Sequence, residues 1–198
     1  MSGDSLIGQG GLFDVEGGCT SPTSNQQADG GSIPTSPLQI SAKDLIVFRI
    51  PMSMADKYSI EKHYLHRTAK NSKIAFGVRT KHDTILRGIA IWGAPVAKIN
   101  QKVYMELRRM FLEDSLPKNS ESRVMSICIR QIKRLFPNVR LLISYSDLSM
   151  GHRGTIYKAS GWIDMGVIKG DKKGGWGTTH TRHKRVEFSD KRKWAYPI

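Results

Sequence analysis

The sequence predicts an α/β (α+β) protein with a mixed β-sheet that carries helices on both faces. Two observations support this fold class. Residues 45–92 have the pattern of a strand, a helix and a hairpin. Residues 104–162 have the pattern of strand, loop, helix, strand, loop and short helix, with loops too short to contain another element. A hairpin makes antiparallel neighbours and a helical crossover makes parallel ones, so one sheet should contain both pairings.

The N-terminal elements follow from apolar runs and their flanking residues. The run LIVFRI at residues 45–50 predicts a strand, and Pro51 then opens a helix predicted to continue through His66. Residues 73–79 and 84–92 predict the two strands of a hairpin.

The strand predicted over residues 104–112 places Met105, Leu107 and Phe111 on one face. Arg109 falls on the same apolar face, which leaves two interpretations open. The side chain either extends to solvent from the strand end, or it is a buried cation held for an anionic ligand.

A helix should begin at Ser120 and end before Pro137, and residues 139–144 predict a strand buried on both faces. Because the helix joins two strands, they should be parallel. The free N–H groups and positive dipole end of this helix offer a place for a phosphate. Asp147 lies where the second strand ends, which is where α/β sheets present ligand-contacting side chains.

The end of this unit is a short helix and a strand. Gly154 turns the chain into the helix, which carries Tyr157 and stops at Gly161. Residues 165–169 then predict a further strand.

Charge divides the 198 residues into two parts. Residues 1–37 contain eight glycines, four acidic residues and no Lys or Arg, which predicts a disordered acidic tail. The whole chain has a formal charge of +14, so without those four negative charges residues 38–198, the predicted folded domain, carry +18. Such an excess favours a polyanionic partner, with nucleic acid first and an anionic membrane surface second. The alternative is that the charge serves solubility alone.

Cysteine usage and hydropathy indicate the compartment. Cys19 and Cys128 have no spacing typical of a disulfide framework or a zinc site. No apolar run is long enough for a membrane span, and no signal peptide pattern is present. A soluble protein of a reducing cytoplasm is therefore expected.

A basic hairpin is predicted at about residues 169–198. Residues 169–193 contain nine Lys or Arg against three acids, interleaved with aromatic side chains. We interpret this hairpin as structural, with Val186 and Phe188 packing, and its tip as a surface for DNA phosphates and bases. The candidate DNA-binding residues are Trp176, Arg182, Lys184 and Arg185. Trp92 is a second candidate for stacking on a base that leaves the duplex.

The order of elements resembles the acetyl-CoA-dependent N-acetyltransferase (GNAT) fold, as does Tyr157 placed four residues before the pair Gly161-Trp162. That resemblance implies acetyl-CoA as cofactor, with Tyr157 as general acid near the leaving thiolate and Asp147 as base. Either side chain could instead be an ordinary hydrogen-bonding residue. The family's Arg/Gln-x-x-Gly-x-Gly/Ala loop is replaced here by LPKNSESR, at residues 116–123.

Several strings in the right order resemble the bacteriophage Mom family of DNA-modification proteins, over about residues 43–168. They are DSLPKNSESR, SYSD, GHRGTIYKAS and the upstream pair His63-Tyr64. The resemblance implies a catalytic domain that converts adenine N6 in double-stranded DNA to N6-carbamoylmethyladenine, protecting phage DNA from host restriction in the cytoplasm of the infected bacterium. Simple acyl transfer would attach a carbonyl to N6, whereas this product has a methylene there, so further chemistry is required.

The Mom resemblance also implies a set of site residues. Iron is expected as a metal, with His63, Tyr64, Asp147 and Tyr157 as its ligands, although His63-Tyr64 alone would indicate polar packing at a helix end. Asp147, Tyr157, Arg109 and Ser122 are the candidate catalytic residues. The candidate cofactor-binding residues are Arg109, Asn119, Ser120, Ser122 and Arg123.

Two alternatives remain on the sequence alone. The first is an N-acetyltransferase acting on a protein or a small amine. The second is a non-catalytic DNA-binding accessory protein.

Overall fold

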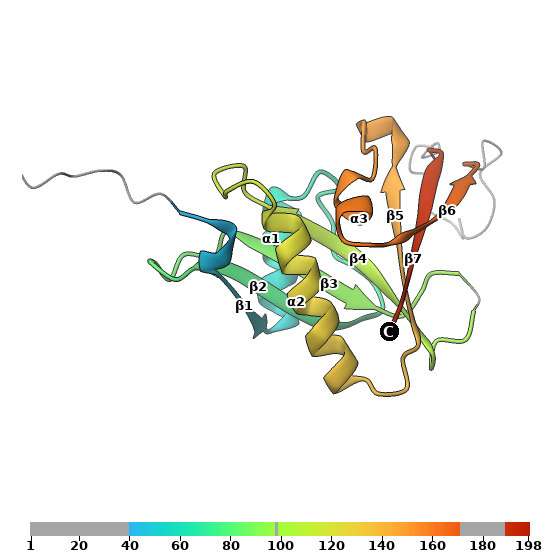
Figure 1. Cartoon of the computed structure of the whole chain (residues 1–198), viewed down its shortest axis with the longest axis horizontal. Helices are drawn as coiled ribbons and strands as arrows, with labels where there is room; N and C mark the ends of the chain where they lie inside the picture. Colours follow the sequence, from blue (N-terminus) through green and yellow to red (C-terminus); the bar gives the residue numbers. More distant parts are fainter. Residues whose placement is uncertain (1–39, 98, 171–188) are drawn as a thin grey trace, which may run out of the picture. The chain divides into compact units, whose positions relative to one another are not determined.

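The computed structural model describes residues 40–97, 99–170 and 189–198 (Figure 1). These residues form a seven-stranded sheet in the order β1-β2-β3-β4-β5-β7-β6. Its strands are β1 (Leu45–Ile50), β2 (Ser72–Thr80), β3 (Gly88–Gly93), β4 (Tyr104–Leu112), β5 (Leu141–Asp147), β6 (Ile163–Ile168) and β7 (Lys191–Pro197). Its helices are α1 (Met52–Lys62), α2 (Ser120–Leu135) and α3 (Thr155–Ala159), with 3-10 turns η1 (Ala42–Asp44) and η2 (Leu148–Met150).

The sheet is mixed, as predicted. Strands β1 to β4 pair antiparallel in chain order. The crossover through α2 makes β4 and β5 parallel, which confirms that prediction. Strand β7 lies between β5 and β6 and is antiparallel to both. The fold class therefore agrees with the sequence prediction.

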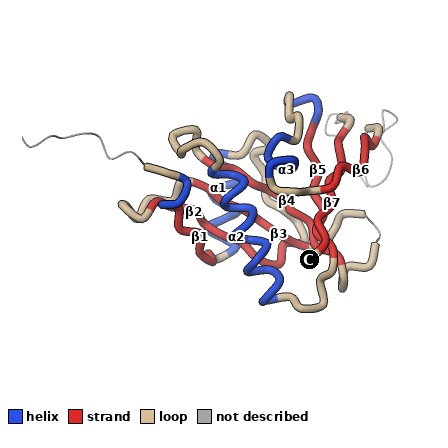
Figure 2. Tube along the Cα trace, in the orientation of Figure 1, coloured by secondary structure: helices blue, strands red, loops and turns tan. Residues whose placement is uncertain are grey.

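Each face of the sheet has its own apolar cluster. On one face, Ala55 of α1 packs with Ile89 and Ile91 of β3. On the other, apolar residues of α2 such as Met125 pack with Phe76 and others of the sheet; Figure 2 shows α2 lying across the strands. Successive side chains of a strand point to opposite faces, so alternating strand residues pack against α1 on one face and α2 on the other.

A bulge in β4 corrects the predicted strand faces. Ile91 pairs with Arg109 and Trp92 pairs with Leu107, so Arg108 is an extra residue in the ladder. Leu107 consequently packs in the α2 cluster, whereas Phe111 packs against the α1 cluster. The prediction that these two side chains share a face was wrong, since simple alternation does not anticipate an inserted residue.

Several predicted boundaries differ from the structure. Helix α1 ends at Lys62 rather than His66, and β3 begins at Gly88 rather than residue 84. Strand β5 covers residues 141–147 rather than 139–144, and β6 covers residues 163–168 rather than 165–169. In the region of the basic hairpin predicted at about residues 169–198, the described strand is β7, and its fully buried Trp194 was not predicted to pack. The packing expected of Val186 and Phe188, like the tail expected at residues 1–37, lies outside the described residues.

The described residues contain no helix that is both long and apolar enough to span a membrane. Cys128 is a free, buried thiol on α2.

Candidate functional site

A cavity of about 630 Å³ opens between β4 and β5. The two strands pair only from Tyr104↔Leu141 to Glu106↔Ile143. Beyond this ladder, the facing backbone edges of β4 and β5 have no strand between them, and the cavity is lined by residues of both. The cavity therefore lies where β4 and β5 separate. Their separation leaves main-chain N–H and C=O groups available to an extended ligand.

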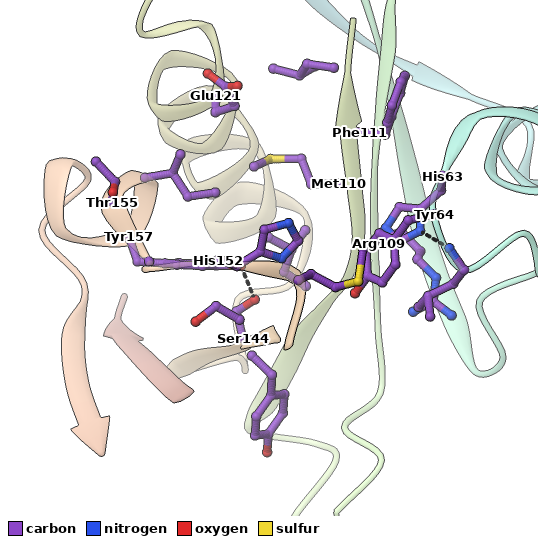
Figure 3. A pocket seen from close by; sticks show the side chains of 18 of the residues that line it. His63, Tyr64, Arg109, Met110, Phe111, Glu121, Ser144, His152, Thr155 and Tyr157 are labelled. Atoms are coloured by element: carbon purple, nitrogen blue, oxygen red, sulfur yellow. Dashed lines mark hydrogen bonds between the residues drawn. The ribbon is translucent and has the colours of Figure 1, made fainter. Parts of the chain in front are cut away.

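The cavity has lining residues on both faces of the sheet (Figure 3). Arg109 and the pair His63-Tyr64 lie on the α1 side of β4, whereas Met110 and Tyr157 lie on the α2 side. The bulge at Arg108 produces this division, because it sets which β4 side chains point to each face.

His63 and Tyr64 directly follow α1 and form one wall of the cavity. The His63 ring is only 5% exposed and stacks on the Tyr64 ring, with centroids 4.4 Å apart. Burial, with the positive charge of Arg109, lowers the pKa of His63 to about 4, so its imidazole is neutral at pH 7. His63 Nδ1 accepts the Leu65 N–H at 3.1 Å, which leaves the ring proton on Nε2. Burial, with the negative charge of Asp147, raises the pKa of Tyr64.

The Arg109 guanidinium lies in the same wall of the cavity as His63 and Tyr64. Its guanidinium donates to the Arg108 carbonyl at 2.6 Å, and its buried Nε has no hydrogen-bond partner among the described residues. Burial and the nearby charges of Arg67 and Arg108 lower its pKa. Of the two interpretations left open by the sequence, the cavity-facing cation is the one that fits this placement.

Tyr157 lies in the opposite wall and is held rigidly. Its hydroxyl is 2.7 Å from Ser144 Oγ, and both side chains are buried. Its ring stacks on Trp194 at 5.3 Å and meets the edge of Trp162 at 5.4 Å. Burial raises the pKa of Tyr157 to about 12, so the phenol keeps its proton at neutral pH.

Asp147 lies at the end of β5 but is not among the residues that line the cavity. One carboxylate oxygen accepts from Ser149 N and Oγ, at 3.0 and 2.6 Å, and the other accepts from Ser189 Oγ at 2.7 Å. Burial would raise its pKa, but these hydrogen bonds outweigh that effect and lower it. The structure thus shows Asp147 as an ionised cap of η2, with its role in catalysis still a prediction.

The iron prediction finds no support in this arrangement. Within the described ranges, no three His, Cys, Asp or Glu side chains gather as a metal site. Of the four predicted ligands, His63 carries its proton on Nε2, Asp147 already accepts hydrogen bonds on both carboxylate oxygens, and Tyr157 is a buried phenol bonded to Ser144. These donors do not fit a metal as they stand, and no step is derived through one.

The predicted cofactor residues at the start of α2 lie outside the lining. Ser120 is buried and donates to Pro117 O, and Ser122 donates to Asn119 O at 3.1 Å. The Arg123 guanidinium reaches the Lys43 carbonyl at 3.4 Å. Glu121 is the residue of this first turn that lines the cavity.

Of the residues predicted to contact DNA, the structure describes only Trp92. Trp176, Arg182, Lys184 and Arg185 lie outside the described residues. Trp92 is fully buried and packs against the Trp162 ring, so the suggestion that it stacks on a base was wrong.

Sequence reasoning did not identify several exposed side chains of the lining, among them Lys62, His152 and Arg153. The His152 ring meets the edge of the Tyr64 ring at 5.7 Å, across the cavity mouth. The signal was present in the string GHRG, because Gly151 and Gly154 have φ values of 70° and 73° and set the shape of this loop.

Solved structures with this arrangement are acetyltransferases. An IAA acetyltransferase from Bacillus cereus aligns with a TM-score of 0.54 and 11% identity, covering 78% of this chain and 99% of that one. A GNAT family acetyltransferase from Elizabethkingia anophelis, with acetyl-CoA bound, aligns with a TM-score of 0.51 and 12% identity over 78% and 99% of the two chains. At such identities the likeness establishes the fold, which is GNAT-like.

Sequence comparison is more specific. The methylcarbamoylase Mom of Escherichia phage Mu is 34% identical over 134 residues, which are 63% of this chain and 55% of that protein. The chain thus spans about half the length of that relative. A model of the Mom protein family matches residues 44–196, from η1 to the last strand of the sheet. The chain belongs to the Mom protein family.

Proposed function

We propose that this protein modifies adenine at N6 in double-stranded DNA, giving N6-carbamoylmethyladenine, and so protects phage DNA from host restriction. The observation that carries the proposal is the 34% identity to a methylcarbamoylase, in a family match that extends across the whole sheet. The excess of +18 outside residues 1–37 supports a polyanionic substrate.

Acetyl-CoA is the proposed donor of the two-carbon unit. Forming the product from it also requires a two-electron oxidant, which removes a hydrogen from the methyl carbon as that carbon bonds to N6, and an ammonia-level nitrogen, which replaces the CoA thiol at the carbonyl. The unpaired edges of β4 and β5 suit an extended amide-containing chain such as pantetheine. The first turn of α2 adjoins the cavity through Glu121, and its N–H groups suit a phosphate, although the Glu121 carboxylate would oppose one. A GNAT family structure that holds acetyl-CoA supports the same choice for this fold.

The side chains of the cavity have distinct proposed tasks. Tyr157 keeps its proton at neutral pH and can donate it, or a hydrogen bond, to a leaving group. Arg109 offers an unpartnered guanidinium N–H to a negatively charged atom. Neutral His63 fixes the Tyr64 ring and presents Nε2–H. Asp147 is proposed to support the loop that carries His152, through its bonds to Ser149 and Ser189.

The test is to express the protein in bacteria, digest their DNA to nucleosides and measure deoxyadenosine by mass spectrometry. A carbamoylmethyl adduct is expected with the wild-type protein and should be lost with Tyr157→Phe. Lys133→Ala on the exposed end of α2 is the matched control and should retain the adduct.

Unmodified adenine from folded wild-type protein would contradict the proposal. A mass shift on a supplied peptide or polyamine would then favour an acetyltransferase of another substrate. Duplex binding without any product would favour an accessory DNA-binding protein.

A further inference from the structure

Two loops carry exposed side chains where the cavity opens to solvent. One follows α1 and carries Lys62, Tyr64 and Arg67, and the other precedes α3 and carries His152 and Arg153. The two loops meet where the His152 ring contacts the Tyr64 ring, although Figure 3 shows His152 on the Tyr157 side of β4. All five side chains are exposed, and all but Arg67 line the cavity. We call these five residues the cavity mouth.

The loop after α1 is fixed by hydrogen bonds. Ser59 Oγ donates to the Arg67 carbonyl at 3.1 Å, and the His66 ring contacts the Ile60 carbonyl at 2.9 Å. Residue 66 also has φ of 43°, which folds the chain back on the helix end. Arg67 is therefore held beside the wall that His63 and Tyr64 form, and its positive charge acts on both rings.

The three cations of this mouth have no ion-pair partner among the described residues. In the part of the chain that the structure describes, Lys62, Arg67 and Arg153 form no ion pair, whereas Lys81, Arg87, Arg108, Lys169 and Arg192 do. The carboxylates that line the cavity, Asp114 and Glu121, follow β4 and open α2. The mouth therefore presents unpaired positive charge around an aromatic opening.

We propose that duplex DNA docks on the cavity mouth, with Lys62, Arg67 and Arg153 on its phosphates and with Tyr64 and His152 flanking the adenine that enters the cavity. The inference rests on the proposed function and adds where the substrate lies. Adenine N6 is reached only if the base leaves the stack, and phosphate contacts next to an aromatic opening would offset that unstacking. None of these five residues is among the DNA-binding residues predicted at 176–185, which lie outside the described residues.

The test compares two double variants that lose the same charge. Arg67→Ala/Arg153→Ala removes two mouth cations, and Lys133→Ala/Arg134→Ala removes two exposed cations from the C-terminal end of α2. Affinity for a short fluorescent duplex is measured by anisotropy over a salt series. The mouth variant should bind about tenfold more weakly, and the slope of log K against log salt should fall by about 2, while the control keeps both.

Thermal unfolding of both variants shows whether each is folded before binding is compared. Equal losses in the two variants, or no loss in the mouth variant, would overturn the inference. Wild-type protein that binds no duplex at low salt would overturn the proposed function itself. If the wild type binds duplex and modifies adenine but the mouth variant is unaffected, the docking inference is wrong and the proposed function still stands.

Discussion

At the scale of single residues, the hydrogen bond between Tyr157 and Ser144 offers a direct test of a catalytic hydroxyl. Tyr157→Phe keeps the ring that stacks on Trp194 but leaves Ser144 Oγ buried without its partner. Stability should fall by about 1–3 kcal/mol in urea unfolding. If Tyr157 is the proton donor, the rate of adenine modification should also fall at least about a hundredfold.

Ser144→Ala is the matched control, because it breaks the same hydrogen bond and keeps the phenol. It should lose similar stability but retain most of the activity. Comparable activity losses in both variants would show that the pair is structural. The double variant should recover part of the stability, since replacing both partners leaves no buried polar group unpaired.

His63 makes a prediction about pH. Its folded pKa of about 4 lies below the usual 6.5, so the unfolded chain takes up a proton that the folded protein does not. Stability should thus be unaffected above about pH 7.5 and fall as the pH is lowered, by at most about 2 kcal/mol at pH 5 and about 3 kcal/mol at pH 4. Urea unfolding at pH 7.5 and pH 5 measures this difference.

His63→Asn should reduce that pH dependence, because an Asn side-chain oxygen can still accept the Leu65 N–H. His82→Asn, at an exposed turn, is the control and should leave the dependence unchanged. An undiminished pH dependence in His63→Asn would assign the effect to other groups.

The cavity residues could be found from sequence only where a motif marked them. Arg109, Tyr157 and the pair His63-Tyr64 do line the cavity, although they lie on three different elements. Asp147 does not, because a strand-end carboxylate can equally cap the following turn, as it does here through Ser149. Spacing along the chain does not reveal which use a side chain will have.

At the scale of elements, Gly154 links the start of α3 to strand β7. Its φ is 73°, and a Cβ at this position would overlap the Trp194 ring. Gly154→Ala should therefore lose about 2–5 kcal/mol of stability, the sum of a left-handed alanine and an overpacked core.

Gly151→Ala provides the matched comparison. Gly151 has nearly the same φ, 70°, but open space around its Cβ position. Urea unfolding should show a loss of only about 1–2 kcal/mol for this variant. If the two variants were equally destabilised, the contact with Trp194 would not restrict the loop.

The same elements show what sequence patterns can and cannot predict. The apolar stripe of α2 and its flanking strands predicted the parallel crossover correctly. The basic hairpin predicted at about residues 169–198 did not identify the position of β7 or the burial of Trp194. The basic run Lys191–Lys193 precedes Trp194, and the burial of this strand depends on β5 and β6 on either side. The bulge at Arg108 was missed for a similar reason, since it depends on the register with β3.

At the scale of the whole molecule, the cavity connects two different faces of one sheet. The α2 face offers a helix start and a buried phenol, and the cavity mouth offers two aromatic rings with cations that have no ion-pair partner among the described residues. Donor and DNA would thus enter by different openings and meet between β4 and β5. This arrangement predicts that both bind at the same time, with no obligatory release of one before the other enters.

Simultaneous binding can be measured by titrating the labelled duplex with and without saturating CoA. The DNA dissociation constant should change by less than about threefold, because the coupling free energy between separate openings is expected to stay below about 0.7 kcal/mol. CoA at a hundred times its dissociation constant should still stabilise Arg67→Ala/Arg153→Ala by about 2.7 kcal/mol, as it does the wild type. Mutual exclusion of CoA and duplex would mean that they share one entrance. In that case the cations of the cavity mouth would bind the phosphates of the cofactor rather than those of DNA.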